Sequence, residues 1–205
     1  MKLAAITLAI GTMFSANLSA NAAELFERGD WSLGGSLSYF NLDTEQAAKL
    51  GISENAFSVG VKVNYLQESW LTTLSGQALI YNDKNSFRED VEGTGIFNNG
   101  DFDIKSSDAS GAIFSIATGG YWRFGDKGSL SFLTQVGLSS VVASERSIAE
   151  CSNCRSEDID LDGGAFVKVA VAKKLESVNI GLQATQYVSG DGLKSSIGVT
   201  LSTTF

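Results

Sequence analysis

The chain has 205 residues, with 15 Lys and Arg, 23 Asp and Glu and no His, and its formal net charge is -8 at pH 7. This acidic balance argues against nucleic acid as a partner. Proline is absent and there are 22 glycines, which disfavours a helical bundle and favours paired strands, because proline interrupts the hydrogen-bond ladder of a sheet.

The first 22 residues have the pattern of a cleaved secretory signal peptide. Lys2 supplies a positive charge, Leu3 to Phe14 form an apolar run, and residues 20–22 read Ala-Asn-Ala, a small-residue cleavage site. The run is too short to cross a bilayer, and no other stretch reaches about 18 apolar residues. We therefore expect residues 1–22 to be removed and residues 23–205 to form the mature domain.

Eight later segments alternate apolar and small polar residues with the period of two that is typical of strands. They run from Trp31 to Leu42, Ala56 to Leu66, Trp70 to Asn82, Ala109 to Phe124, Ser129 to Ser144, Gly164 to Leu175, Val178 to Val188 and Ser195 to Phe205. The polar face is mostly Ser, Gly, Thr, Gln and Ala, whereas a sheet face in bulk water usually carries long charged side chains. Small residues suit the narrow interior of an eight-stranded barrel, so we predict apolar side chains outside and small polar ones inside.

The lengths of the connections support the same prediction. Long loops near residues 43–55, 83–108 and 145–163 alternate with short turns, and only the connection at 189–192 is shorter than this alternation predicts. Outer-membrane barrels have short periplasmic turns, longer outer loops and aromatic girdles. Trp31, Trp70 and Trp122 all fall at the short-turn end, where amphipathic rings anchor a barrel at the membrane interface.

The last segment ends on Phe205, with Leu201, Val199 and Ile197 at alternate positions before it. This ending resembles the C-terminal recognition signal of bacterial outer-membrane barrels, and the mature chain is similar in architecture to the small eight-stranded barrels of the OmpA/OmpX type and the OmpW type. The resemblance implies an all-β, eight-stranded antiparallel up-and-down transmembrane β-barrel in the outer membrane of a Gram-negative bacterium. Its implied partners are outer-membrane lipid and, through the C-terminal strand, the barrel-assembly machinery.

The sequence lacks the catalytic groups of barrel enzymes. By family resemblance those enzymes use Ser-His or Asp-His arrangements to activate a nucleophile or water, and histidine is absent here. We therefore expect a protein that is not an enzyme and that carries no cofactor. A Ser-Lys or carboxylate pair is the catalytic alternative.

Cys151 and Cys154 are the two cysteines of the chain. Haem attachment would need His at the next position, which is Arg155, and a zinc site would need two further ligands. We predict a disulfide in the third long loop, as is typical of an oxidising compartment. A redox or metal role is the alternative.

Asp158, Asp160 and Asp162 precede Gly163 in a run that begins like an EF-hand loop. The pattern then fails, because its twelfth position is Val169 where a bidentate Glu is required. We predict no metal site, with incidental binding of a divalent cation as the alternative.

Two strands are expected to extend beyond the membrane. Ile159 and Leu161 keep the register of Val167, which predicts that the sixth strand continues outward with an acidic edge. Phe102 and Ile104 predict a similar extension of the fourth strand.

Lys62, Arg123 and Lys168 are cations on the predicted inner face, where we assign no carboxylate. Buried charges need partners. One interpretation is a narrow water-filled path that prefers anions, and the other is a closed barrel in which loop carboxylates or ordered water satisfy the cations.

These patterns favour a non-enzymatic outer-membrane protein with a structural or surface-recognition role carried by acidic extracellular loops. The alternative function is a narrow channel for small anionic or apolar solutes.

Overall fold

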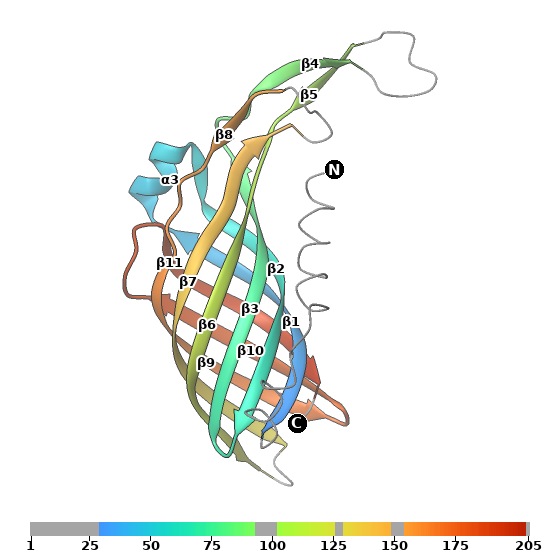
Figure 1. Cartoon of the computed structure of the whole chain (residues 1–205), viewed down its shortest axis with the longest axis vertical. Helices are drawn as coiled ribbons and strands as arrows, with labels where there is room; N and C mark the ends of the chain where they lie inside the picture. The colour runs from blue at the N-terminus through green and yellow to red at the C-terminus, as the bar shows by residue number, and fades with distance from the viewer. Residues whose placement is uncertain (1–28, 93–101, 126–128, 149–153, 204–205) are drawn as a thin grey trace, which may run out of the picture.

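The structure is a computed structural model, and it describes residues 29–92, 102–125, 129–148 and 154–203. Strands account for most of these residues (Figure 1). In chain order the elements are β1 (Asp30–Leu42), α3 (Thr44–Leu50), β2 (Ile52–Gln67), β3 (Trp70–Asp83), β4 (Arg88–Glu92), β5 (Phe102–Ser106), β6 (Asp108–Phe124), β7 (Leu130–Ser147), β8 (Ser156–Asp158), β9 (Gly164–Leu175), β10 (Val178–Tyr187) and β11 (Leu193–Thr203). No helix in the described ranges has the length and apolar character needed to cross a membrane.

Eight of the strands close into a barrel. The order around the sheet is β6-β3-β2-β1-β11-β10-β9-β7, and β6 also pairs with β7. Each of these pairings is antiparallel, including the one between the first and last strands, β1 and β11. The predicted all-β fold, an eight-stranded antiparallel up-and-down barrel, is confirmed.

The two ends of the barrel differ in their connections. We call the end that carries α3, the β4–β5 hairpin, β8 and the connection at 188–192 the loop end, and the opposite end the turn end (Figure 1). The short connections between β2 and β3, between β6 and β7, and between β9 and β10 lie at the turn end. The alternation of long and short connections therefore follows the prediction, with the short fourth connection at the loop end.

Two predicted details of the loop end differ in the structure. The segment expected as a loop at 43–55 contains α3, and β2 already begins at Ile52. The expected extension of the fourth strand is separated from β6 by Ser107, and it forms β5, which pairs with β4 instead of continuing the barrel wall. An unpaired strand extension would leave its backbone groups without partners in the sheet, and the hairpin supplies them.

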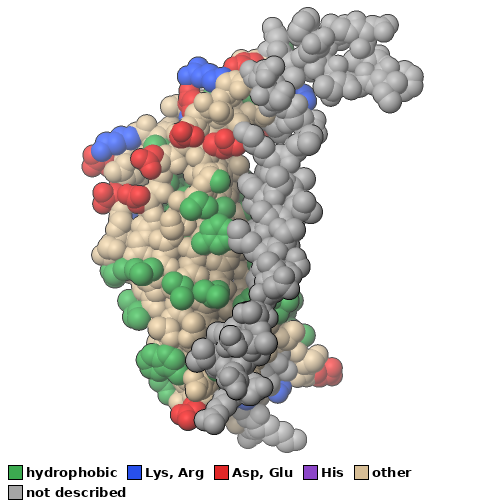
Figure 2. All heavy atoms as spheres, in the orientation of Figure 1, with side chains coloured by type: hydrophobic (Ala, Val, Ile, Leu, Met, Phe, Trp, Pro, Cys, Tyr) green, Lys and Arg blue, Asp and Glu red, His purple; other side chains and the backbone are tan. Residues whose placement is uncertain are grey.

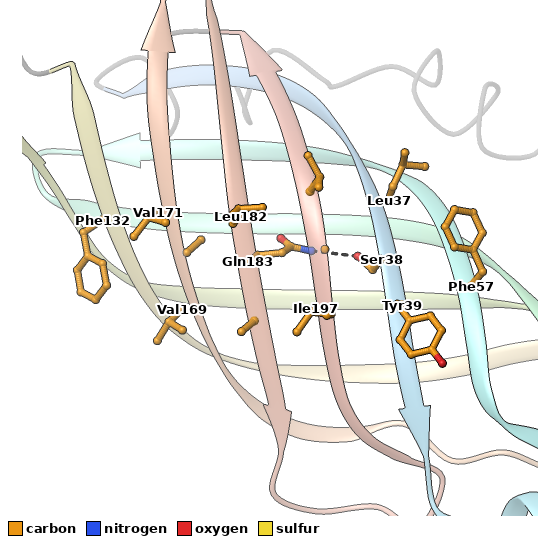
Figure 3. A pocket seen from close by; sticks show the side chains of 14 residues that line it. Leu37, Ser38, Tyr39, Phe57, Phe132, Val169, Val171, Leu182, Gln183 and Ile197 are labelled. Carbon is orange, nitrogen blue, oxygen red and sulfur yellow. Dashed lines mark hydrogen bonds between the residues drawn. The ribbon is translucent and has the colours of Figure 1, made fainter.

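The side chains of the barrel wall alternate as predicted. Leu37 and Val199 are 50 % and 48 % exposed on the outside, whereas the neighbouring Ser38 is 2 % exposed. Figure 3 shows the outward Leu182 and Ile197 on strands whose inner side holds a hydrogen bond from Gln183 to Ser38. The barrel therefore presents an apolar belt outward and encloses small hydroxyl and amide side chains.

Aromatic rings gather at the turn end. Trp31 packs on Tyr65 with ring centroids 5.0 Å apart, and Trp122 stacks on Phe132 at 5.9 Å. Trp70 donates a hydrogen bond from Nε1 to Thr118 Oγ1 at 2.7 Å. Each tryptophan is about half exposed, as expected of rings that stand between hydrocarbon and water.

A charge placed in the middle of the apolar belt tests the outward face. We expect Val199→Lys to lower the free energy of unfolding by about 2–4 kcal/mol in lipid vesicles, because the ammonium would lie near the bilayer midplane. The control, Val188→Lys, places the same charge at the loop end and is expected to cost about 0–1 kcal/mol. Urea unfolding followed by tryptophan fluorescence measures both, and equal losses for the two variants would contradict the assignment of the belt.

Candidate functional site

An apolar cluster fills the loop end of the barrel. Inward side chains of several strands meet there, and the buried members are Phe40, Leu42, Ala47, Ile52, Ala56, Leu79, Tyr81, Ala109, Ile113, Ala117, Ile159, Leu161, Phe166, Tyr187 and Leu193. The ring of Tyr187 lies 6.4 Å from that of Phe40 and 5.5 Å from that of Phe166, measured between centroids. We refer to this set as the apolar plug. It occupies the space in which a channel would need an open path.

Ile159 and Leu161 reach the apolar plug from the segment after β8. Both are less than 5 % exposed, and the Ile159 N–H donates to the Ser144 carbonyl at 2.9 Å. The expectation that the sixth strand continues outward in this segment is therefore wrong, since β9 begins only at Gly164. Burial of two large aliphatic side chains over the barrel mouth is favoured over their exposure to water.

Arg146 is the buried cation of the loop end. It lies near the end of β7 and is 3 % exposed. Its Nε donates to both carboxylate oxygens of Asp83, at 2.8 and 2.7 Å, and its Nη1 donates to Glu157 Oε2 at 2.8 Å. Its Nη2 donates to the carbonyls of Leu50 and Gly51, at 3.0 and 3.3 Å.

The partners of Arg146 come from three different loop-end connections. Asp83 ends β3 at the base of the second connection, Glu157 lies in β8, and Leu50 ends α3. Hydrogen bonding to Asp83 raises the pKa of Arg146 above its ordinary value, against the opposing effect of burial. A single guanidinium therefore ties the three connections together above the apolar plug.

The short helix α3 is capped at both ends. The Asp43 carboxylate accepts from the N–H groups of Glu45 and Gln46 at 2.9 and 3.0 Å and pairs with Lys194 at 3.0 Å. At its other end Gly51 takes φ of 65°, a left-handed conformation that glycine adopts without steric cost. Because the Asp43 N–H also donates to the Gly192 carbonyl at 2.9 Å, α3 is fixed to the fourth connection.

Below the apolar plug, toward the turn end, the lumen is polar. Gln135 Nε2 donates to the Leu71 carbonyl and to Thr73 Oγ1, each at 3.0 Å. The network continues from Thr73 to Asn64 at 2.9 Å and from Asn64 to Ser32 at 3.0 Å. These bonds cross from β7 to β3, β2 and β1, so they join strands that are not all neighbours in the sheet.

The three predicted lumen cations occupy two different regions. Lys62 on β2 and Lys168 on β9 lie within the wall and are half-buried, and neither ammonium has a hydrogen bond or ion pair with another described residue. Arg123 lies at the turn end of β6, is exposed, and stands over the Tyr121 ring at 5.5 Å from its centroid. The structure therefore places two of the three cations together in the lumen.

The acidic run that begins at the end of β8 points away from the barrel. Asp158, Asp160 and Asp162 are exposed, and they alternate with the buried Ile159 and Leu161. Within the described ranges no group of three Asp, Glu, Cys or His side chains is arranged to hold a metal ion. The alternation of exposed aspartates with buried aliphatic residues indicates a segment that has one face toward water and the other toward the apolar plug.

Other sequence predictions fall partly or wholly outside the described residues. Cys154 is described but Cys151 is not, so the disulfide stays a prediction, as does the signal peptide at 1–22. Of the assembly signal, Ile197, Val199 and Leu201 face outward on β11, and Phe205 lies outside the described residues.

Arg146 and the apolar plug were missed by reasoning from the sequence. Arg146 falls in the stretch expected as the third loop, beyond the bulge in which Ala143 adopts φ of 50°. A bulge shifts the alternation by one residue, so the period of two that marks the rest of β7 carries no signal for Arg146. The aromatic and aliphatic residues on the inward face near the strand ends are the signal that could have indicated the apolar plug.

Comparisons with known proteins give no family. No protein-family model matches this chain, and no curated protein matches it in sequence. Among solved structures, the crystal structure of Neisserial surface protein A is similar, with 8% sequence identity, a TM-score of 0.46, and coverage of 85% of this chain and 97% of that one. The fold assignment rests on the strand pairing and not on this likeness.

Removal of the buried cation tests the tie between the connections. We expect Arg146→Met to lower the free energy of unfolding by about 3–5 kcal/mol, because it leaves the carboxylate of Asp83 buried without its partner. The control is Arg155→Met, which removes an exposed guanidinium from Glu157 and is expected to cost about 0–1 kcal/mol. Urea unfolding reports the two values, and wild-type stability of the Arg146 variant would show that the tie contributes nothing.

The cap of α3 is expected to depend on pH. A hydrogen bond from the Gln46 N–H, with help from Lys194, holds the pKa of Asp43 below its ordinary value of 3.8. The contribution of the carboxylate is therefore complete above this value and is lost as the pH falls through the lower pKa of the folded state. Hydrogen exchange of the Gln46 amide, corrected for intrinsic rates, should lose protection in acid in the wild type and not in Asp43→Asn. Equal acid sensitivity of both proteins would refute the assignment.

Proposed function

We propose that the protein is a non-enzymatic β-barrel of the bacterial outer membrane whose loop end faces the exterior and acts in surface recognition. The apolar belt supports the membrane location, because a closed barrel satisfies every backbone group of a strand in a medium without water. The proposal includes export by the signal peptide, assembly through the outward residues of β11, and a disulfide between Cys151 and Cys154.

The observation that carries the proposal is the construction of the loop end. The apolar plug closes the mouth, Arg146 joins three of the connections above it, and the β4–β5 hairpin projects beyond them (Figure 1). Recognition sites are commonly formed by loops that a rigid scaffold positions. Connections that are already held together fit such a role, because they lose less conformational entropy on binding a partner than mobile loops would lose.

The charge of the loop end also fits recognition. Acidic and basic side chains gather there, whereas apolar side chains spread over the barrel wall below (Figure 2). The exposed carboxylates include Asp158 at the end of β8, Asp160 and Asp162 after it, and Glu45 on α3. Such a surface favours partners with complementary positive charge and speeds their encounter.

The channel alternative is less well supported than recognition. Large side chains such as Phe40, Phe166 and Tyr187 fill the loop end of the lumen, and eight strands leave little room beyond the side chains themselves.

Epitope tags and a hairpin deletion test the proposal. A tag inserted between β4 and β5 should be labelled by antibody on intact cells, whereas a tag in the turn at Glu176 should be labelled only after the outer membrane is permeabilised. Deletion of residues 88–106 should leave the barrel folded, because β4 and β5 pair only with each other, and should reduce attachment of producing cells to surfaces. Reversed labelling would refute the orientation, and unchanged attachment with a correctly inserted barrel would refute the recognition role.

A further inference from the structure

Lys62 and Lys168 lie on opposite walls of the barrel. Lys62 belongs to β2 and Lys168 to β9, and these strands are separated by β1, β11 and β10 on one side and by β3, β6 and β7 on the other. With three strands between them in each direction, the two residues occupy opposite walls of the lumen.

The strand register places the two lysines at the same height. On one side of the barrel, Lys62 pairs with Gly34 on β1, which pairs with Ser202 on β11. Ser202 pairs with Asn179 on β10, and Asn179 pairs with Lys174 on β9. On the other side, Lys62 pairs with Ser75 on β3, which pairs with Ser115 on β6. Ser115 pairs with Ser139 on β7, and Ser139 pairs with Gly164 on β9. The difference between the two end points is the stagger that closes a tilted barrel. The position on β9 at the same height as Lys62 is therefore midway between Gly164 and Lys174, next to Lys168.

The two residues are far apart in sequence and on non-adjacent strands, but they bring charge of the same sign into one lumen. Two like charges in one narrow lumen repel each other, because the surrounding protein screens them less than bulk water does.

The described wall supplies no counter-charge at this height. By the same register, the inward residues there are Ser36, Thr73, Gln135, Gln183, Thr200 and Ala117, the last of which also belongs to the apolar plug, and none is acidic. Most of them are hydroxyl or amide side chains. An amide N–H or a hydroxyl can donate a hydrogen bond to an anion, but none of these side chains can neutralise an ammonium.

The polar side chains at this height are incompletely satisfied. Lys62, Lys168 and Gln183 are half-buried, whereas Ser36, Thr73 and Thr200 are buried. The neighbouring Gln135 has a buried Oε1 without a hydrogen-bond partner, and Gln135 is paired in register with Lys168. Among the described residues, two ammonium groups and one amide oxygen therefore lack partners at this height, whereas the Arg146 guanidinium above the apolar plug has several.

We propose that the lumen binds one small inorganic anion between Lys62 and Lys168. An anion between two ammonium groups converts their repulsion into two attractions and offsets the cost of burying charge. Since the apolar plug closes the loop end, the ion enters from the turn end and stays as a resident of the lumen. The proposal does not depend on the surface-recognition role.

The test compares anions that differ in size. Protein purified from membranes is unfolded with urea at constant ionic strength in sodium chloride, sodium phosphate or sodium gluconate, whose anion is the bulkiest of the three. Chloride or phosphate at ten times its dissociation constant should lower the unfolding equilibrium constant about tenfold relative to gluconate. Lys62→Gln combined with Lys168→Gln should abolish this difference.

The matched control changes two lysines at the turn end of β9. Lys173→Gln combined with Lys174→Gln removes the same charge from an exposed site, so its anion dependence should equal that of the wild type. If the luminal variant does not fold, broadening of the ³⁵Cl resonance by the wild-type protein, reversed by excess bromide, tests the site directly. Equal stability of the wild type in all three salts, or the same anion dependence in the luminal variant, would overturn the proposal.

Discussion

The closure of one hydrogen-bond ladder is the constraint on which the rest of the structure depends. Antiparallel pairing of β1 with β11 joins the two ends of the sheet, so the wall has no edge strand and no unpaired row of backbone groups. A wall of this kind can face hydrocarbon. Closure also forces alternate residues inward, where the interior of eight strands is just wide enough for side chains to fill it.

This constraint divides the interior into two parts with different chemistry. Toward the loop end the inward residues are large and apolar, and residues after β8 complete the apolar plug. Toward the turn end they are hydroxyls and amides that hydrogen-bond across the lumen. Lys62 and Lys168 lie in the polar part, and Arg146 lies above the apolar part, with carboxylate partners. The two kinds of buried cation therefore differ in whether the chain supplies the opposite charge.

The barrel wall was predictable because its signal is local and repeats. Each strand alternates with a period of two, and the bounds of β9, Gly164–Leu175, agree with the prediction. The loop end was not predictable in the same way. Ile159 and Leu161 were expected to face outward in a continued strand, but their burial depends on a surface that residues distant in sequence create. Arg146 likewise depends on Asp83, Leu50 and Glu157 meeting in space, and no spacing in the sequence reports that meeting.

The most direct test of the account is the accessibility of β11 to reagents from lipid and from water. Spin labels placed singly at residues 197–201, in a background with both native cysteines replaced by serine, should collide with lipid-soluble oxygen in an alternating pattern. We predict high oxygen accessibility at Ile197, Val199 and Leu201, which face outward, and low accessibility at Gly198 and Thr200, which face the lumen. The opposite pattern, or uniform accessibility along the strand, would contradict a barrel with its apolar face in the membrane.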